Sequence, residues 1–367
     1  MQNGRRAFLR AAAALTATGA LPQLSWADAG APDYLAAARR PSGDFALFGL
    51  SSDGAALFEI ALPGRGHAAA AHPKRPLAVA FARRPGTFAL VIDCALGAEI
   101  ARLDAPGGRH FYGHGAFDRN GSRLYTCENA YETGDGVIGV WDASRGFERI
   151  GEMPSGGVGP HELVFDPASD RLVIANGGVQ THPVSGRAKL NLPVMRPNLA
   201  YLDIASGGIL SVVEPAEALR LNSIRHLALR PDGLVAIAMQ WQGDLAEAPP
   251  LLATHRFGEA GLRLHAAPEP EQLRMRGYGG SVAFSGDGTV VALTSPRGGR
   301  LHLFDAKTGA FCEALAMTDV CGVAPSRDGL LATDGQGAMT TIAADGRSQP
   351  RRRHAVAWDN HLVRLGA

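Results

Sequence analysis

Short apolar runs alternate with turn residues along almost the whole chain, and the clearest example occupies residues 281–317. There "SVAFSGDG", "TVVALTSPRGG", "RLHLFDAKTG" and "AFCEALAM" predict four successive strands separated by turns rich in Gly, Asp and Pro. Asp287-Gly288 and Thr308-Gly309 supply residues that tolerate the left-handed backbone of tight hairpin turns. An antiparallel meander of four strands in roughly 40 residues is typical of one blade of a β-propeller.

The same order of strands and turns recurs, with first strands that start near residues 67, 114, 161, 226, 281 and 322. Residues 33–62 predict three more strands with no first strand before them. The C-terminal stretch "HAVAWDNHLVRL" can supply it, through either "HAVAW" or "NHLVRL". The sequence therefore predicts an all-β fold, a seven-bladed β-propeller of four-stranded antiparallel blades, closed by the N- and C-terminal strands. Eight blades or a β-sandwich are the alternatives. Residues 177–195 and 243–250 are predicted insertions between strands.

The first 27 residues have the composition of an export signal. Arg5 and Arg6 precede an apolar stretch, and "SWA" at residues 25–27 places small residues at a cleavage position. The paired arginines followed by "AFLR" predict a twin-arginine signal. We therefore expect residues 1–27 to be a signal peptide and residues 28–367 to be a single propeller domain, exported in folded form to the periplasm.

Composition excludes some partners. The chain has 36 Lys and Arg against 35 Asp and Glu, so it has no basic field for nucleic acid. Beyond the signal, no apolar run approaches about 18 residues, so no membrane contact is expected after signal removal. The four cysteines lack metal-site spacing, and the sequence leaves open whether Cys312 and Cys321 form a disulfide or stay as buried thiols.

Histidines recur where the predicted first strands begin. Because these strands line the central channel of a propeller, their first residues should meet at one mouth of the channel. The candidate central pocket contains His67, His110, His114, His161, Glu162, Arg225, His226 and Ser281, and His354 is a candidate for the seventh position. Neutral imidazoles bind iron, copper or zinc and can move protons. His67, His114, His161 and His226 are therefore candidate metal ligands. The alternative is that each histidine only stabilises its own blade.

Two further stretches hold candidate polar groups. The segment "RHFYGHG" (109–115) surrounds His110 with aromatic residues and is either part of a metal site or an aromatic packing corner. The least blade-like segment, 176–195, offers a candidate loop site formed by Asn176, His182, Arg187, Lys189 and Asn191. Its cations could bind a carboxylate or phosphate, or the loop is only a solvated excursion. Arg297 in "TSPRGG" is predicted to serve the turn alone.

Several stretches together resemble one known family. They include "FYGHGAF", "GPHEL", "ANGGVQTHP", "GRAKLNLPVM", "SIRHLAL" and "WDNHL". They are similar to an exported bacterial family catalogued as domain of unknown function 1513, over nearly all of the expected mature chain. The resemblance implies a periplasmic seven-bladed propeller related to quinoprotein-like and YVTN propellers. It also implies a role connected with iron or redox handling, with no established activity and no catalytic residues to transfer.

Two functions agree with these observations. The first is a binding or assembly protein that holds a transition metal or small ligand, or docks a periplasmic partner of an iron or redox system. The alternative is an enzyme of the lactonase or quinoprotein-dehydrogenase type. Against the enzyme, Glu162 is the one carboxylate at the expected mouth, and only four Trp occur in the chain. HExxH, GxSxG and Walker signatures are also absent from the sequence.

Overall fold

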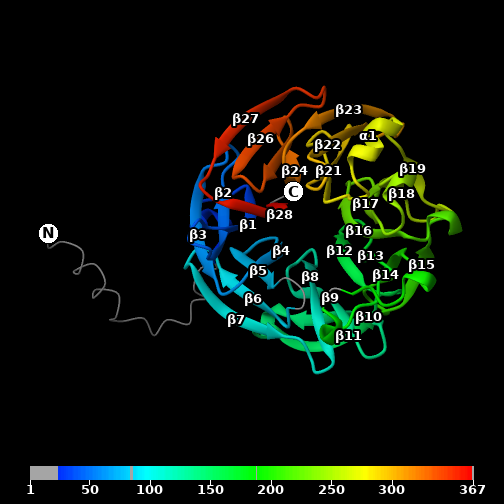
Figure 1. Cartoon of the computed structure of the whole chain (residues 1–367). Coiled ribbons are helices and arrows are strands. Elements are labelled where there is room, and N and C mark those ends of the chain that lie inside the picture. Colours follow the sequence, from blue (N-terminus) through cyan, green and yellow to red (C-terminus); the bar gives the residue numbers. More distant parts are fainter. Residues whose placement is uncertain (1–23, 83–85, 187, 366–367) are drawn as a thin grey trace, which may run out of the picture.

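The computed structural model describes residues 24–82, 86–186 and 188–365. These residues form seven four-stranded antiparallel sheets arranged as blades around a central axis (Figure 1). The predicted seven-bladed propeller is confirmed, and the eight-blade and sandwich alternatives are wrong. Most of the predicted signal peptide, residues 1–23, lies outside the described residues, and the signal stays a prediction.

The blades follow one another in chain order, and the first strand named in each blade is the innermost one, next to the channel. Blade 1 contains β28 (Ala357–Arg364), β1 (Tyr34–Arg39), β2 (Phe45–Leu50) and β3 (Ala56–Leu62). Blade 2 contains β4 (Gly66–Ala71), β5 (Leu77–Ala82), β6 (Phe88–Asp93) and β7 (Ala98–Asp104). Blade 3 contains β8 (Arg109–Phe117), β9 (Arg123–Ala130), β10 (Asp135–Asp142) and β11 (Glu148–Pro154).

The second half of the chain repeats this order. Blade 4 contains β12 (Pro160–Asp166), β13 (Arg171–Asn176), β14 (Asn198–Asp203) and β15 (Ile209–Val213). Blade 5 contains β16 (Asn222–Leu229), β17 (Val235–Trp241), β18 (Leu252–His255) and β19 (Arg263–His265). Blade 6 contains β20 (Ser281–Phe284), β21 (Val290–Ser295), β22 (Arg300–Asp305) and β23 (Phe311–Ala316). Blade 7 contains β24 (Val320–Ser326), β25 (Gly329–Asp334), β26 (Ala338–Ile342) and β27 (Ser348–Arg353).

Blade 1 joins the two ends of the fold. The C-terminal strand β28 pairs antiparallel with β1, from Tyr34 opposite Arg364 to Arg39 opposite Ala357. The register shifts opposite Ala36–Ala38, so one bulged strand takes in the end of "HAVAW" and most of "NHLVRL". This pairing closes the ring, so that blades 1 and 7, like the others, are each packed between two neighbours.

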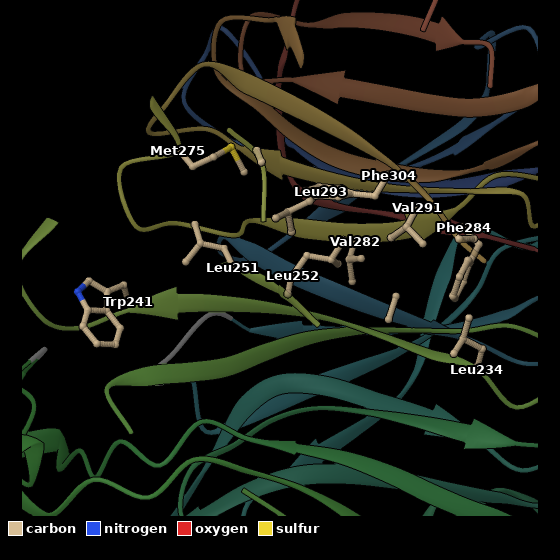
Figure 2. Packing of buried hydrophobic residues seen from close by; sticks show 14 residues of the cluster. Leu234, Trp241, Leu251, Leu252, Met275, Val282, Phe284, Val291, Leu293 and Phe304 are labelled. Carbon is tan, nitrogen blue, oxygen red and sulfur yellow. The ribbon is translucent and has the colours of Figure 1, made fainter. Parts of the chain in front are cut away.

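The hydrophobic core lies between neighbouring blades. The described residues form seven buried clusters, and each cluster joins two adjacent blades. Figure 2 shows the cluster in which Leu251 and Leu252 face Val282, Val291 and Leu293 of the next blade. The middle strands are buried on both faces, which explains why they are nearly continuous apolar runs in the sequence.

Both predicted insertions are present. The first joins β13 to β14 and contains the short 3₁₀ helices η3 (Pro183–Ser185) and η4 (Leu192–Val194); the second joins β17 to β18 and contains η6 (Leu245–Glu247). Further 3₁₀ turns are η1 (Trp26–Ala29), η2 (Ala143–Arg145) and η5 (Glu217–Leu219). The sequence did not predict α1 (Glu269–Arg274), which precedes β20. Within the described ranges, no helix is both long and apolar enough to cross a bilayer.

All four cysteines are free thiols. Cys312 lies on the outermost strand of blade 6 and is exposed, whereas Cys321 is buried on the innermost strand of blade 7. The disulfide left open by the sequence is therefore not formed, and the expectation of a buried thiol is wrong for Cys312. Their strands, β23 and β24, are consecutive in the chain but belong to different blades, so one cysteine lies at the outer edge of blade 6 and the other at the inner edge of blade 7.

The closing strand should contribute strongly to stability. Trp358 of β28 is 4% exposed and packs edge-on against Phe48, with ring centroids 5.3 Å apart. We expect Trp358→Ala to lower the free energy of unfolding by about 3–5 kcal/mol, because it leaves a large cavity beside the closure. Urea unfolding measures this effect. As a control, Ile150→Ala on exposed β11 should change stability by less than about 0.5 kcal/mol; equal effects would contradict the role of the closure.

Acid should destabilise the fold through buried imidazoles. Burial lowers the pKa of His302, on β22, to about 4, against about 6.5 in the unfolded chain. Between these values the unfolded state binds more protons, so the stability is intact above pH 6.5 and falls as the pH drops toward 4. His302→Leu should reduce the loss of stability between pH 7.5 and pH 5 by about 2 kcal/mol. Urea titrations at both pH values test this, and an unchanged acid dependence would contradict it.

Candidate functional site

Five histidine rings meet at the centre of the propeller. They come one each from five innermost strands, and we call them the histidine cluster: His67, His114, His161, His226 and His361. Eight pairs of rings have centroids 4.7–5.8 Å apart. His114 is the most central, because its ring contacts the other four. The structure therefore brings together all four histidines predicted as metal ligands and adds a fifth.

Irregular pairing in the inner strands places these side chains. The register shifts between Gly66 and Ala69 in blade 2, between Phe111 and Gly115 in blade 3, and between Ala36 and Ala38, opposite β28, in blade 1. It shifts likewise beside His161 and His226. A bulge interrupts the alternation of side chains along a strand and re-aims a residue. By contrast, β20 pairs regularly with β21 and contributes no histidine.

The cluster also depends on a glycine. Gly113 has a φ of +101°, and a Cβ added there would lie 2.6 Å from Cδ2 of His67. A side chain at this position would therefore be strained and would also push the His67 ring away. The sequence "YGHG" thus combines the bulge, the close approach and the central histidine in four residues.

Glu162 is the carboxylate of the site. Its Oε2 atom lies 2.9 Å from Nδ1 of His226 and accepts the backbone N–H of Leu227 at 3.2 Å. Its Oε1 atom lies 3.6 Å from Nδ1 of His114. The carboxylate therefore holds the His226 ring through Nδ1 and lies near Nδ1 of His114. It leaves the Nε2 atoms of both rings for other partners, as outer carboxylates do for metal-ligating histidines.

Burial favours the neutral form of three of the imidazoles. It holds the pKa of His114 and of His161 well below 6.5 and lowers the pKa of His226 to about 3; neighbouring histidines and Arg225 add to the effect. Burial also raises the pKa of Glu162 to about 7, which His361 and the Leu227 N–H partly oppose. Neutral imidazole is the metal-binding form, so these rings need not lose protons to bind a cation at neutral pH.

Two ring nitrogens in the cluster have no hydrogen-bond partner among the described residues. They are Nε2 of His114 and Nδ1 of His161. Candidate ligand atoms of His67, His114 and His361 lie within 4.8 Å of one another, and so do those of His114, His161 and His226. Two nitrogens on one tetrahedral metal ion lie about 3.3 Å apart, since metal–nitrogen bonds measure about 2.0–2.1 Å. The ligand atoms lie up to 4.8 Å apart here, so the rings would have to rotate to bring three nitrogens onto one ion.

The cluster separates two cavities. The upper cavity, at the end where the inner strands begin, has a volume of about 330 Å³ and is lined by His67, His161, Arg225 and Asn360 among others. The lower cavity, of about 500 Å³, is lined by the next residues along the same strands, including Ala68, Glu162 and His361. His226 lines both cavities. The histidines therefore form a layer across the channel that is accessible from both sides.

The remaining central-pocket candidates lie around this layer. Arg225 lines the upper cavity and Ser281 the lower cavity. His110 is buried but does not join the cluster: its Nε2 lies 3.0 Å from Nδ2 of Asn129, and its ring stacks on Tyr131. In "RHFYGHG", His110 therefore belongs to an aromatic packing corner, whereas His114 belongs to the histidine cluster.

At the seventh predicted position, on the closing strand, the channel histidine is a different residue from the one predicted. His354 precedes β28, where its Nε2 donates to the Gly54 carbonyl at 2.8 Å and its ring packs on Trp358. His361, three residues beyond Trp358, occupies the channel position instead. The expectation for His354 is wrong because the closing strand begins at Ala357 and carries its bulge in the middle.

The predicted loop site divides in the structure. Asn176 is fully buried and donates to Ser155 O and Asn198 Oδ1, so it joins strands. Asn191 accepts from Gln180 N and donates to Gly178 O, which fixes the loop onto itself. His182 caps η3 and lies 3.5 Å from Glu132. Lys189 alone reaches the upper cavity, and Arg187 lies outside the described residues.

Sequence reasoning missed two residues of the site. His361 occurs in "WDNHL", but only the strand register selects it over His354. Arg297 also lines the upper cavity, although its turn predicted no more than turn chemistry. For Arg297 the available signal was the pair of glycines that follows it; the long loop was the signal that did identify Lys189.

Comparison with known sequences now adds a family. The family model described as "Protein of unknown function (DUF1513)" matches residues 60–365. The chain belongs to this DUF1513 family. No curated protein matches the DUF1513 chain significantly in sequence. Among solved structures, Kuenenia stuttgartiensis hydrazine synthase is similar, with a TM-score of 0.58 and 14% identity over 94% of this chain and 99% of that chain. At this identity the likeness shows the propeller fold alone.

Proposed function

We propose that this DUF1513 protein is a periplasmic binding protein that holds one divalent transition-metal ion in the histidine cluster. The observation that carries the proposal is the meeting of five imidazole rings from five blades at the centre of the propeller. Histidines that only stabilised their own blades would not need to contact one another across blades. Buried ring nitrogens normally have partners, and an ion at the centre would supply one to Nε2 of His114 and Nδ1 of His161.

The donor set indicates the class of metal. Imidazole nitrogens suit iron, copper, zinc and nickel, whereas calcium and magnesium prefer oxygen ligands. Among divalent first-row ions, such a site binds Cu²⁺ most tightly at equilibrium, in line with the general order of stability. A cation here would also favour the ionised form of Glu162, which would strengthen the contacts of that carboxylate with His114 and His226.

The proposed location and partners rest on the sequence alone. The twin-arginine pattern supports export of the folded chain, and the resemblance to the exported family supports a role in iron or redox handling with a periplasmic partner. An enzyme of the lactonase or quinoprotein-dehydrogenase type is the second candidate. The observation that favours it is the upper cavity, which opens directly onto His67, His161 and His226. Turnover of lactones or alcohols that His161→Ala abolishes would support the enzyme over the binding protein.

Metal analysis tests the proposal. Metal-free protein dialysed against Zn²⁺ or Cu²⁺ and then against buffer should retain one equivalent by mass spectrometry. His114→Ala/His161→Ala should retain less than a tenth of that amount while its thermal melt stays cooperative. The matched control, His182→Ala/His354→Ala, removes two histidines outside the cluster and should bind like the wild type. Equal retention by all three proteins, or none in the wild type, would overturn the metal site.

Glu162 should act through the histidines it orients. Glu162→Gln keeps the shape of the side chain but removes the charge, so we expect metal affinity to fall by about 10–100-fold with one equivalent still bound. Competition with a chromogenic chelator measures the affinity. Glu132→Gln, which alters an exposed Glu–His contact at His182, should leave it unchanged. A complete loss of stoichiometry in Glu162→Gln would instead make the carboxylate a direct ligand.

A further inference from the structure

The upper cavity has a strongly positive lining. Lys189 reaches it from the long β13–β14 insertion, Arg225 from β16, and Arg297 from the turn between β21 and β22. The described residues that line this cavity include no Asp and no Glu. Three cations from separate parts of the chain therefore converge on a small space without a carboxylate on its wall.

Two of these cations contact a neutral side chain. Nζ of Lys189 donates to Oε1 of Gln242, and the guanidinium of Arg297 lies 4.4 Å from the centroid of the Tyr278 ring. Neither side chain forms an ion pair with any described residue. Many arginines elsewhere have carboxylate partners; Arg230, for example, lies 2.8 Å from Asp232. The cavity thus keeps positive charge that the protein does not neutralise itself.

The positive groups influence one another. Burial lowers the pKa of Lys189, and the charges of Arg225 and Arg297 lower it further. Like charges held together in a partly buried space are unfavourable, and a bound anion would offset that cost. Guanidinium groups suit such an anion because their planar fork can bind both oxygens of a carboxylate or two oxygens of a phosphate.

The loop that carries Lys189 is held in place before any ligand binds. Leu190 N donates to Gln180 O, Asn191 bridges to Gly178, and Arg220 donates to Leu192 O at 3.0 Å. The residues that follow Lys189 are therefore anchored to the start of the same insertion and to Arg220. Such preorganisation reduces the entropy lost on binding. The cavity, at about 330 Å³, lies at the small end of known ligand pockets, which span about 300–1,000 Å³.

From these observations we infer that the upper cavity binds a small oxyanion with two or more negative charges, a polycarboxylate or a phosphate. Lys189, Arg225 and Arg297 hold its oxygens, and Gln240 and Asn360 line the same space. The inference needs no metal, although His67, His161 and His226 lie at the floor of the cavity. With an ion in the cluster, the bound anion would face it directly, so the anion site deepens the proposed function and does not depend on it.

Isothermal titration calorimetry of the metal-free protein tests the site. Metal is removed with a chelating resin, because soluble chelators are themselves polycarboxylates. The probes are acetate, succinate, tricarballylate and inorganic phosphate at constant ionic strength. We expect affinity to rise at least tenfold from acetate to the trianion, and to fall as NaCl is raised from 50 to 500 mM, in keeping with charge screening. Comparison of tricarballylate with phosphate decides which oxyanion the cavity prefers.

Variants connect this binding to the cavity. Lys189→Gln and Arg297→Gln should each weaken tricarballylate or phosphate binding at least tenfold, and Arg297→Lys, which keeps the charge, should weaken it less. Arg347→Gln, at a strongly exposed position elsewhere, is the matched control and should bind like the wild type. Absence of binding at 10 mM by every anion, or wild-type affinity in Lys189→Gln and Arg297→Gln, would overturn the inference. His114→Ala protein distinguishes the two proposals: His114 is not among the described residues that line the upper cavity, and loss of metal with retained anion binding would separate them.

Discussion

The pairing of β28 with β1 is the contact on which the rest of the structure depends. It converts a row of sheets into a closed ring, in which each sheet buries its faces against two neighbours. It also brings His361 to the centre. The bidentate contact of Arg65 with Asp359, at 2.7 and 3.0 Å, ties the closing strand to the start of blade 2. Closure of the fold and completion of the histidine cluster are therefore one event.

The cost of the cluster is spread over the ring. Five imidazoles lie close together in the interior, and burial favours the neutral forms of His114, His161 and His226. A single blade could not hold such a group, because one strand presents at most two or three side chains to the channel. In the propeller, five strands contribute one ring each, and bulges bend those strands locally. The blades that contribute no histidine show that the fold does not require one at this position.

Much of the fold could be predicted because its signals are local. Gly- and Asp-rich turns mark the hairpins, the blade period follows from the chain, and His67, His114, His161 and His226 occur at the same point of each unit. The rest depends on long-range register. The choice of His361 over His354 is set by how a C-terminal strand pairs with Tyr34–Arg39, more than 300 residues away in sequence. Arg297 and Lys189 meet only because an insertion in blade 4 and a turn in blade 6 reach the same mouth. Asn176, in turn, is a strand-joining residue whose burial no local pattern indicates.

The two cavities share His226, and this has a consequence for how the centre could be addressed. A small molecule in the upper cavity would contact His67, His161 and His226, and a protein bound over the lower cavity would contact His114, His226 and His361, so the two would approach the cluster from opposite sides. A change that one of them causes in the charge or orientation of His226 would also affect the other, because His226 lines both cavities. His226 thus provides a direct link between the two cavities on opposite sides of the histidine cluster.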